Sequence, residues 1–295
     1  TGSSKAFTLA GGDGQDILTG GAGADIITGG GAVDTIVGGA AVDTITGGAG
    51  NDIITGGTGN DIITVDAGTD TVTDLGGGGS GGESDVVIVS SGATLNATGV
   101  VSFTATSATQ NNSTDAANAV LTAADGGNRT ISVANATGSS KAFTIAGGDG
   151  QDILTGGAGA DIITGGAAVD TIVGGAAIDT ITGGAGNDII TGGTGNDIIT
   201  VDAGTDTVTD LGGGGSGGES DVVIVSSGAT LNATGVVSFT ATSATQNNST
   251  DAANAVLTAA SGGSTMNVSA ATGSGVSFTL TGGAGADILT GGAGA

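Results

Sequence analysis

Several residue types on which catalysis and globular packing depend are missing from this chain. Its 295 residues include no Pro, Cys, His, Trp or Tyr, and only five Phe and one Met. Without His, Cys or Tyr, no Ser has a base that could activate it, so we expect that the chain is not an enzyme. So few large side chains cannot build a bulky core, and a narrow core of stacked aliphatic side chains fits better.

Basic residues are scarce as well. Lys5, Arg129 and Lys141 stand against 28 acidic residues, which gives a formal net charge of −25. Nothing in the chain could neutralise phosphates, so we exclude nucleic acid as a partner, and anionic membrane surfaces would repel the chain. No apolar run reaches the roughly 18 residues of a membrane span, and we expect no insertion into a membrane.

The residues that are abundant point to a repeat architecture. Of the acidic residues 26 are Asp and two are Glu, and turns and hard-cation sites prefer the shorter side chain. Glycine accounts for 65 residues without a Gly-X-Y period, while 37% of the chain is hydrophobic. Such a chain can bury its Val and Ile, which argues against disorder and favours repeats.

Two periods are nested in the sequence. Residues 1–124 match residues 137–260 at a shift of 136 with three differences, and a third copy begins near Thr272. Repeats this similar indicate one unit used in tandem. Because the chain ends in the middle of a motif, we interpret it as part of something longer.

Within each unit lies a period of nine residues. From Gly11 the segments read GGDGQDILT, GGAGADIIT, GGGAVDTIV, GGAAVDTIT, GGAGNDIIT, GGTGNDIIT and VDAGTDTVT. The eighth position is always Leu, Ile or Val, and the sixth is always Asp. These aspartates are Asp16, Asp25, Asp34, Asp43, Asp52, Asp61 and Asp70, then Asp152, Asp161, Asp170, Asp179, Asp188, Asp197 and Asp206, and finally Asp287 in the third copy.

The letters of each segment predict a strand and a turn. Three β-forming residues predict a short strand, and six glycine-rich residues turn the chain. Two segments make one 18-residue coil, and stacked coils give two parallel sheets with position eight inside. The stacked aspartates would repel one another unless a cation lay between them, and oxygen ligands select a hard ion, Ca²⁺. We therefore predict an all-β fold, a parallel β-roll or β-solenoid stacked on Ca²⁺, in tandem 136-residue modules.

The segments resemble the RTX (repeats in toxin) family of calcium-binding nonapeptides, whose pattern is G-G-x-G-x-D-x-U-x. The resemblance covers residues 11–73 and 147–209, with a fragment at 282–295. It implies a β-roll that binds Ca²⁺ between each segment and the next but one, with the fifteen aspartates as ligands. If every such pair bound an ion, the two arrays would hold about ten, and their charge of +20 would reduce −25 to −5.

Some segments depart from the pattern. Ala32 and Ala41 stand where the motif has Gly, and a left-handed turn there would be strained by about 1–2 kcal/mol. Segment seven lacks both leading glycines. We expect sites that use Asp34, Asp43 or Asp70 to be weaker, altered or empty.

Other acidic residues lie outside the sixth position. We interpret Asp13 and Asp149 as solvated. For the residues after the first array we favour a charged loop, with an ion site at the array's end as the alternative. These residues are Asp66, Asp74, Glu83 and Asp85.

The periods divide the chain into six parts. Between the arrays, short β-rich pieces favour longer, irregular coils of the same solenoid over a small β-sandwich. The parts are residues 1–10, a cap or the end of a preceding coil; 11–73, the first roll; 74–146, a linker and irregular β-solenoid or small β domain; 147–209, the second roll; 210–281, a linker and irregular β segment; and 282–295, the start of a third roll.

Tandem modules point to a structural role. They resemble the surface-layer and extracellular-filament branch of the family more than the single repeat block of a toxin. We expect a secreted structural protein at the bacterial cell surface, exported unfolded by type I secretion and folded by extracellular Ca²⁺. Its partners would be copies of itself, in a homopolymer or lattice, and cell-surface polysaccharide. The alternatives are the calcium-rigidified stalk of a large adhesin, or the repeat region of a secreted toxin or enzyme with its active domain elsewhere.

Overall fold

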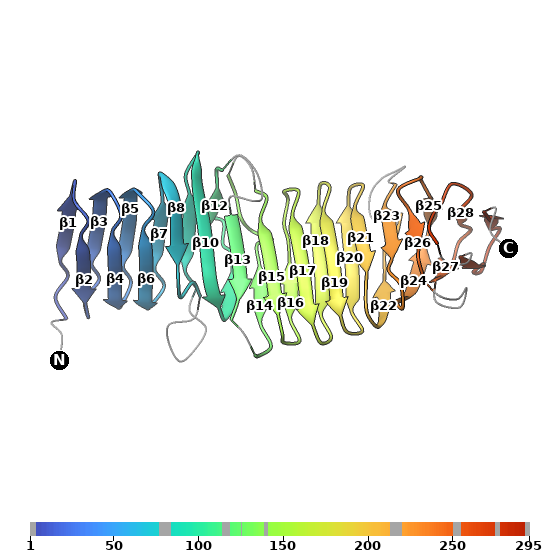
Figure 1. Cartoon of the computed structure of the whole chain (residues 1–295), viewed down its shortest axis with the longest axis horizontal. Helices are drawn as coiled ribbons and strands as arrows, with labels where there is room; N and C mark the ends of the chain where they lie inside the picture. The colour runs from blue at the N-terminus through green and yellow to red at the C-terminus, as the bar shows by residue number, and fades with distance from the viewer. Residues whose placement is uncertain are drawn as a thin grey trace. The chain divides into compact units, whose positions relative to one another are not determined.

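The chain consists of β-strands wound into coils. The computed structural model describes residues 4–76, 84–113, 119–124, 126–138, 141–212, 220–249, 255–274 and 278–292. It divides into two compact units, Thr1–Gly148 and Asp149–Ala295, and each is a parallel β-solenoid (Figure 1). Within the described ranges there is no helix, and hence none long and apolar enough to cross a membrane. The predicted fold class is confirmed.

The described residues of the first unit form fifteen strands. They are β1 (Thr8–Gly12), β2 (Ile17–Gly21), β3 (Ile26–Gly31), β4 (Thr35–Ala40), β5 (Thr44–Ala49), β6 (Ile53–Thr58), β7 (Ile62–Val65), β8 (Gly68–Val72), β9 (Val86–Val89), β10 (Ala93–Val100), β11 (Ser102–Thr104), β12 (Gln110–Asn111), β13 (Ala119–Ala123), β14 (Thr130–Ser132) and β15 (Thr144–Gly148).

The second unit repeats this order. Its strands are β16 (Ile153–Thr155), β17 (Ile162–Ala167), β18 (Thr171–Ala176), β19 (Thr180–Ala185), β20 (Ile189–Thr194), β21 (Ile198–Val201), β22 (Thr205–Val208), β23 (Val222–Val225), β24 (Thr230–Val236), β25 (Ser238–Thr240), β26 (Gln246–Asn247), β27 (Ala255–Ala259), β28 (Thr265–Asn267), β29 (Thr279–Thr281) and β30 (Ile288–Thr290).

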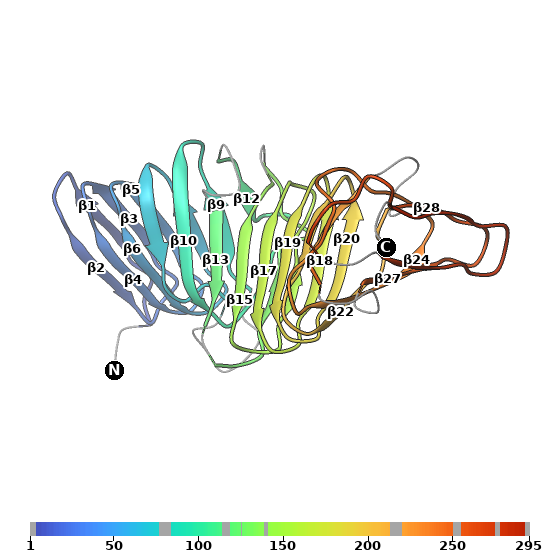
Figure 2. The same ribbon diagram turned by 45° about the vertical axis from the view of Figure 1, so that its right-hand side comes forward.

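Strands pair with the next but one along the chain, as the period of nine predicts. In the first unit β1, β3, β5 and β7 form one sheet, and β2, β4, β6 and β8 form the other (Figure 2). All of these pairs are parallel, and Ile27 lies opposite Ile45, which lies opposite Ile63. Each step is 18 residues, so one coil is two nonapeptides.

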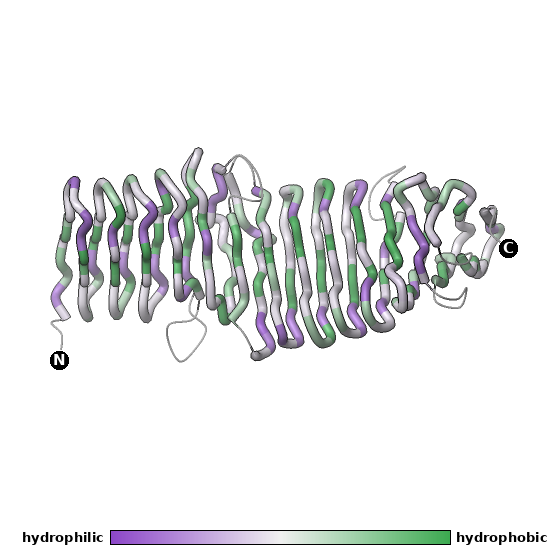
Figure 3. The backbone as a smooth tube through the Cα atoms, in the orientation of Figure 1, coloured by the Kyte–Doolittle hydropathy of each residue, from purple (hydrophilic) through white to green (hydrophobic). Residues whose placement is uncertain are grey.

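The eighth position of the repeat forms the core. Ile27, Ile36, Ile45 and Ile54 have no exposed surface, and hydrophobic stretches recur at matching heights in successive coils of the first unit (Figure 3). The preceding position points outward: Ile17 is 83% exposed. This alternation is the period of two that a strand imposes on its side chains.

The strands of the arrays are longer than the three residues that the sequence predicts. β3 continues through its glycines to Gly31, and Gly30 lies opposite Gly48 on the next coil. Gly30 has a φ of +121°, and a methyl group there would collide with the carbonyl oxygen of Gly12. The glycines therefore allow adjacent coils to approach closely within the sheets, and the turns are shorter than predicted.

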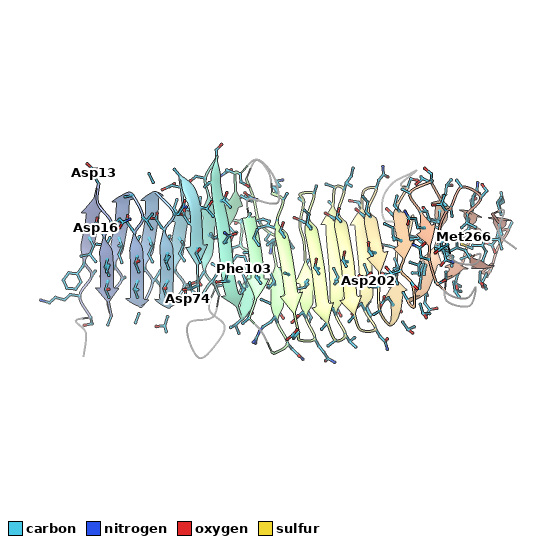
Figure 4. All side chains as sticks on the ribbon, in the orientation of Figure 1. Asp13, Asp16, Asp74, Phe103, Asp202 and Met266 are labelled. Carbon is cyan, nitrogen blue, oxygen red and sulfur yellow. The ribbon has the colours of Figure 1, made fainter. Side chains whose placement is uncertain are left out.

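Between the arrays the coils are wider but keep parallel pairing. β9 pairs with β7, β10 with β8, and β13 with β10. A further parallel pair, β11 with β14, places Phe103 opposite Ile131, and both side chains are buried. In the second unit β25 and β28 do the same with Phe239 and Met266; Figure 4 labels Phe103 and Met266. Aromatic and large side chains thus fill the coils that contain more residues.

Adjacent isoleucines allow a direct test of the inward and outward positions. We expect Ile54→Ala to lower the free energy of unfolding by about 2–4 kcal/mol, because it opens a cavity in a fully buried column. Ile53→Ala removes a side chain that is 46% exposed and should cost less than about 1 kcal/mol. Urea unfolding of the calcium-loaded protein measures both, and equal losses would contradict the assignment of the core.

Candidate metal centres

The aspartates at position six form hydrogen-bonded ladders along the edges of the coils. From Asp34 to Asp70, Oδ1 accepts a hydrogen bond from the backbone N–H of the aspartate one coil earlier, while Oδ1 of Asp25 accepts from the N–H of Phe7. The N–H of Asp25 donates to Asp43 at 2.7 Å, and the N–H of Asp43 donates to Asp61 at 2.7 Å. The opposite edge has the same ladder through Asp34 and Asp52, at 2.8 Å. The ladders recur in the second unit.

In most of these carboxylates the second oxygen is buried and accepts no hydrogen bond. A buried carboxylate oxygen that accepts no hydrogen bond is unfavourable unless something else satisfies it. The residues with such an Oδ2 are Asp16, Asp25, Asp34, Asp43, Asp52, Asp61, Asp70, Asp170, Asp179, Asp188 and Asp206.

A carbonyl oxygen from the next coil faces this orphan oxygen. A methyl carbon placed on Gly38 would lie 2.5 Å from Oδ2 of Asp43 and 2.5 Å from the carbonyl oxygen of Gly56. Two acceptors therefore converge on the space that the missing side chain leaves open. The same pair of oxygens converges at Gly11, Gly20 and Gly29 in the first unit and at Gly156, Gly165 and Gly174 in the second.

Two facing acceptors in a buried space are the donor set of a hard cation. Carboxylate and carbonyl oxygens are the ligands that Ca²⁺ prefers, and the ion would supply the positive charge that the paired oxygens lack. Among the described residues no group of three acidic, His or Cys side chains gathers. This fits sites in which the backbone contributes ligands beside each single carboxylate.

Comparison with known families identifies the repeats. The profile of the RTX calcium-binding nonapeptide repeat, in four copies, matches residues 10–45, 37–72, 144–172, 173–208 and 279–295. The chain carries RTX calcium-binding repeats. Proteins with RTX repeats are typically secreted. A comparison with proteins of curated function gave no match.

Two of the expected ligands differ from the others. Oδ2 of Asp161 accepts a hydrogen bond from the N–H of Gly157 at 2.7 Å, while the carbonyl oxygen of Gly174 also faces it. In the third, partial RTX copy, Asp287 accepts from Gly283 and from Ser264, so backbone donors reach both of its oxygens. For the fifteen aspartates as a set, calcium ligation stays a prediction.

The irregular RTX segments three and four are strained, as the sequence predicts. Ala32 and Ala41 have φ values of 68° and 81°, in the left-handed region. Asp34 and Asp43 nevertheless face a carbonyl oxygen in the same way as the aspartates of regular segments. The strain therefore leaves the oxygen pair in place, and weaker binding at these sites stays a prediction.

Segment seven breaks the pattern of oxygen pairs. A methyl carbon on Gly47 would lie 2.7 Å from Oδ2 of Asp52, but the next nearest atom is Cδ1 of Ile54 at 3.4 Å. No carbonyl oxygen lies within that distance. Segment seven begins at Val65 instead of a glycine. Where Asp52 lies beside this segment, no carbonyl oxygen faces its Oδ2.

Sequence reasoning missed the last members of the ladder. Asp85 is 3% exposed, and its Oδ1 accepts the N–H of Asp61 at 2.8 Å, where a charged loop was expected. Asp221 has the same role in the second unit. The available signal was an Asp followed by Val-Val-Ile, but it lies 24 residues after Asp61 instead of 18.

The remaining acidic residues near the array take individual roles. Asp66 accepts from the hydroxyl of Ser90, and Asp74 accepts from backbone amides at the end of the array, where Figure 4 labels it. Asp13 and Asp149 are exposed. Glu83 lies outside the described residues.

Burial makes Asp61, Asp170 and Asp179 difficult to ionise when no cation is bound. Burial raises the pKa of Asp179 to about 8 and that of Asp170 and Asp61 to about 7, with the neighbouring ladder charges adding to the shift. The backbone hydrogen bond to each carboxylate acts in the opposite direction but does not offset burial. The calcium-free fold therefore favours the neutral acids.

The direction of these pKa shifts predicts opposite pH dependence with and without calcium. In the calcium-free fold, pKa values raised above 3.8 stabilise the protein fully at low pH, and this stabilisation is lost as the pH rises toward about 8. With EGTA we expect more β-structure at pH 5 than at pH 8.5, by circular dichroism. With calcium the ligands must be ionised, so affinity should fall as the pH falls.

Sedimentation controls for aggregation near the sequence pI of about 4.1. A calcium-free protein that gains structure as the pH rises would contradict the burial of these acids.

The space beside each position-one glycine can be filled to test the oxygen pair. We expect Gly38→Ala to abolish one calcium site, because its methyl group would occupy the space on which Asp43 and the Gly56 carbonyl converge. Gly14→Ala is the control, since a methyl group there meets nothing within 4 Å. Metal analysis after equilibrium dialysis counts the ions, and loss of none in Gly38→Ala would contradict this location.

Proposed function

We propose that the chain is part of a secreted structural protein whose calcium-dependent β-rolls build a bacterial surface layer or an extracellular filament. The observation that carries this proposal is the repetition of one outer surface. Two nearly identical units display the same exposed side chains in the same order. Identical surfaces in tandem suit repeated contact with further copies, since several weak contacts add to one strong one.

The exposed side chains at position seven form columns along each sheet. Ile26 lies opposite Thr44, which lies opposite Ile62, so Ile and Thr alternate from coil to coil. Ile26 is 54% exposed, and its counterpart Ile162 is 42% exposed. Exposed apolar side chains in a regular row favour lateral contact between copies of this chain.

Calcium reduces the obstacle to such contact. A formal charge of −25 would hold separate copies apart, and each bound Ca²⁺ removes two negative charges. Folding and association would then respond to the same ion. Export in an unfolded state by type I secretion, followed by folding in extracellular calcium, fits this scheme, and cell-surface polysaccharide is a further candidate partner.

Catalysis is not part of this proposal. The sequence holds no His, Cys or Tyr, and the abundant carboxylates lie buried in the ladders. A buried acid directed at a backbone carbonyl is poorly placed to meet a substrate. The proposal therefore assigns no reaction to this chain. A catalytic domain found elsewhere in a longer protein would instead favour the repeat region of a secreted toxin or enzyme.

Electron microscopy across a calcium titration tests the assembly. We expect calcium to produce regular sheets or filaments that EGTA disperses. Replacing Ile26, Ile62, Ile162 and Ile198 by Thr, the residue at Thr44 and Thr180, should prevent assembly while leaving calcium-dependent circular dichroism unchanged. Monomeric rods with the wild-type chain would instead favour the stalk of a large adhesin, and assemblies from the Thr variant would contradict the role of these columns.

A further inference from the structure

The last carboxylate of the ladder makes different hydrogen bonds from the carboxylates within it. Inside the ladder, Oδ1 of Asp43 accepts a backbone N–H, while its Oδ2 faces the carbonyl oxygen of Gly56 and has no donor. At Asp85 both oxygens have donors: Oδ1 accepts the N–H of Asp61 at 2.8 Å, and Oδ2 accepts the N–H of Gly76 at 2.6 Å. An amide thus stands where an internal carboxylate would require a cation.

The second unit ends its ladder in the same way. Asp221 accepts the N–H of Asp197 at 2.9 Å and that of Gly212 at 2.5 Å. Asp85 and Asp221 are 3% and 4% exposed, so these are buried carboxylates in which each oxygen accepts a backbone N–H. The arrangement therefore recurs in both copies of the repeat.

A second aspartate closes the same edge of each array. Asp74 stands 18 residues after Gly56, at the register position where earlier segments carry a glycine. Its carboxylate accepts the N–H of Gly56 at 2.9 Å and that of Gly57 at 2.7 Å. Asp210 does the same to Gly192 and Gly193 in the second unit. The aspartate side chain thus takes the place that the backbone of a further segment would have occupied.

On the opposite edge the carbonyl oxygen is missing from the fifth register. Beside Gly47 the space near Oδ2 of Asp52 is bordered by Ile54, and beside Gly183 the space near Asp188 is bordered by Ile190. A single acceptor needs only a donor such as water, whereas two facing acceptors need a cation that both can bind. The fifth register therefore lacks the pair of oxygens that the first four registers of the first array share.

The coils that follow the first array contain no such unsatisfied oxygens. Among the described residues between 84 and 138, every buried side-chain oxygen or nitrogen has a partner. Asp85 belongs to the first of these coils, and strand β9 of that coil pairs with β7 of the array. The array is therefore joined at this end to coils whose polar groups need no ion.

We propose that the first array takes four calcium ions, not five, and that Asp74 with Asp85, and Asp210 with Asp221, close the arrays without metal. The fifth register of each array and the space near Asp287 would hold no ion, because they lack a facing carbonyl. This inference rests on the proposed calcium binding of the arrays.

Asparagine substitutions separate the registers, because Asn keeps the Oδ1 acceptor and replaces only Oδ2. Equilibrium dialysis against calcium, with metal analysis of the whole chain, should give one ion fewer for Asp43→Asn than for the wild type. Asp52→Asn should lose none. The two positions are adjacent in the repeat and equally buried, so they form a matched pair.

Substitution of a carboxylate that closes an array gives a second test, measured by urea unfolding. Asp85→Asn would direct an amide N–H₂ at the N–H of Gly76, so we expect a lower urea midpoint for the calcium-loaded chain with an unchanged number of ions. If this variant does not fold, Asp52→Asn still decides between four registers and five. Loss of one ion in Asp52→Asn would overturn the closure while calcium binding stands. A wild type without calcium would overturn both proposals.

Discussion

The structure depends on pairs of buried oxygens that face each other with no hydrogen between them. Each regular coil edge places a carboxylate oxygen against a carbonyl oxygen of the next coil, and glycine leaves the space open for both. Such a pair is unfavourable in an empty site and favourable around a hard cation, so the proposed function makes folding depend on calcium. The period of nine, the glycines and the excess of Asp over Glu all follow from this requirement.

Packing and ion binding are coupled through the coil. The hydrogen bond from each aspartate N–H to the next aspartate fixes the carboxylate, and the isoleucine two positions later enters the core. A coil therefore cannot dock its Ile without also aligning its oxygens. Because each coil contacts mainly its neighbours, stability should propagate along the array, and its ends need a separate solution. Backbone N–H groups that donate hydrogen bonds to Asp74 and Asp85 provide that solution.

Much of this arrangement is readable from sequence. Position eight predicts the core, the sixth-position Asp predicts the ladder, and Ala32 predicts its own strained turn. The length of the strands is not readable, since glycines signal turns but here pair across adjacent coils. Asp85 was missed because six extra residues separate it from Asp61, and a periodic pattern loses a member when one coil lengthens. Whether an oxygen meets an amide or a carbonyl depends on three-dimensional register, which spacing alone does not specify.

The most direct test of this account is far-ultraviolet circular dichroism of the whole chain at pH 7.5, in calcium and after removal of calcium by EGTA. The account predicts strong β-structure with calcium, its loss on chelation and its return when calcium is restored. Unchanged β-structure after chelation, with metal analysis showing no bound calcium, would contradict the claim that the facing oxygens require the ion.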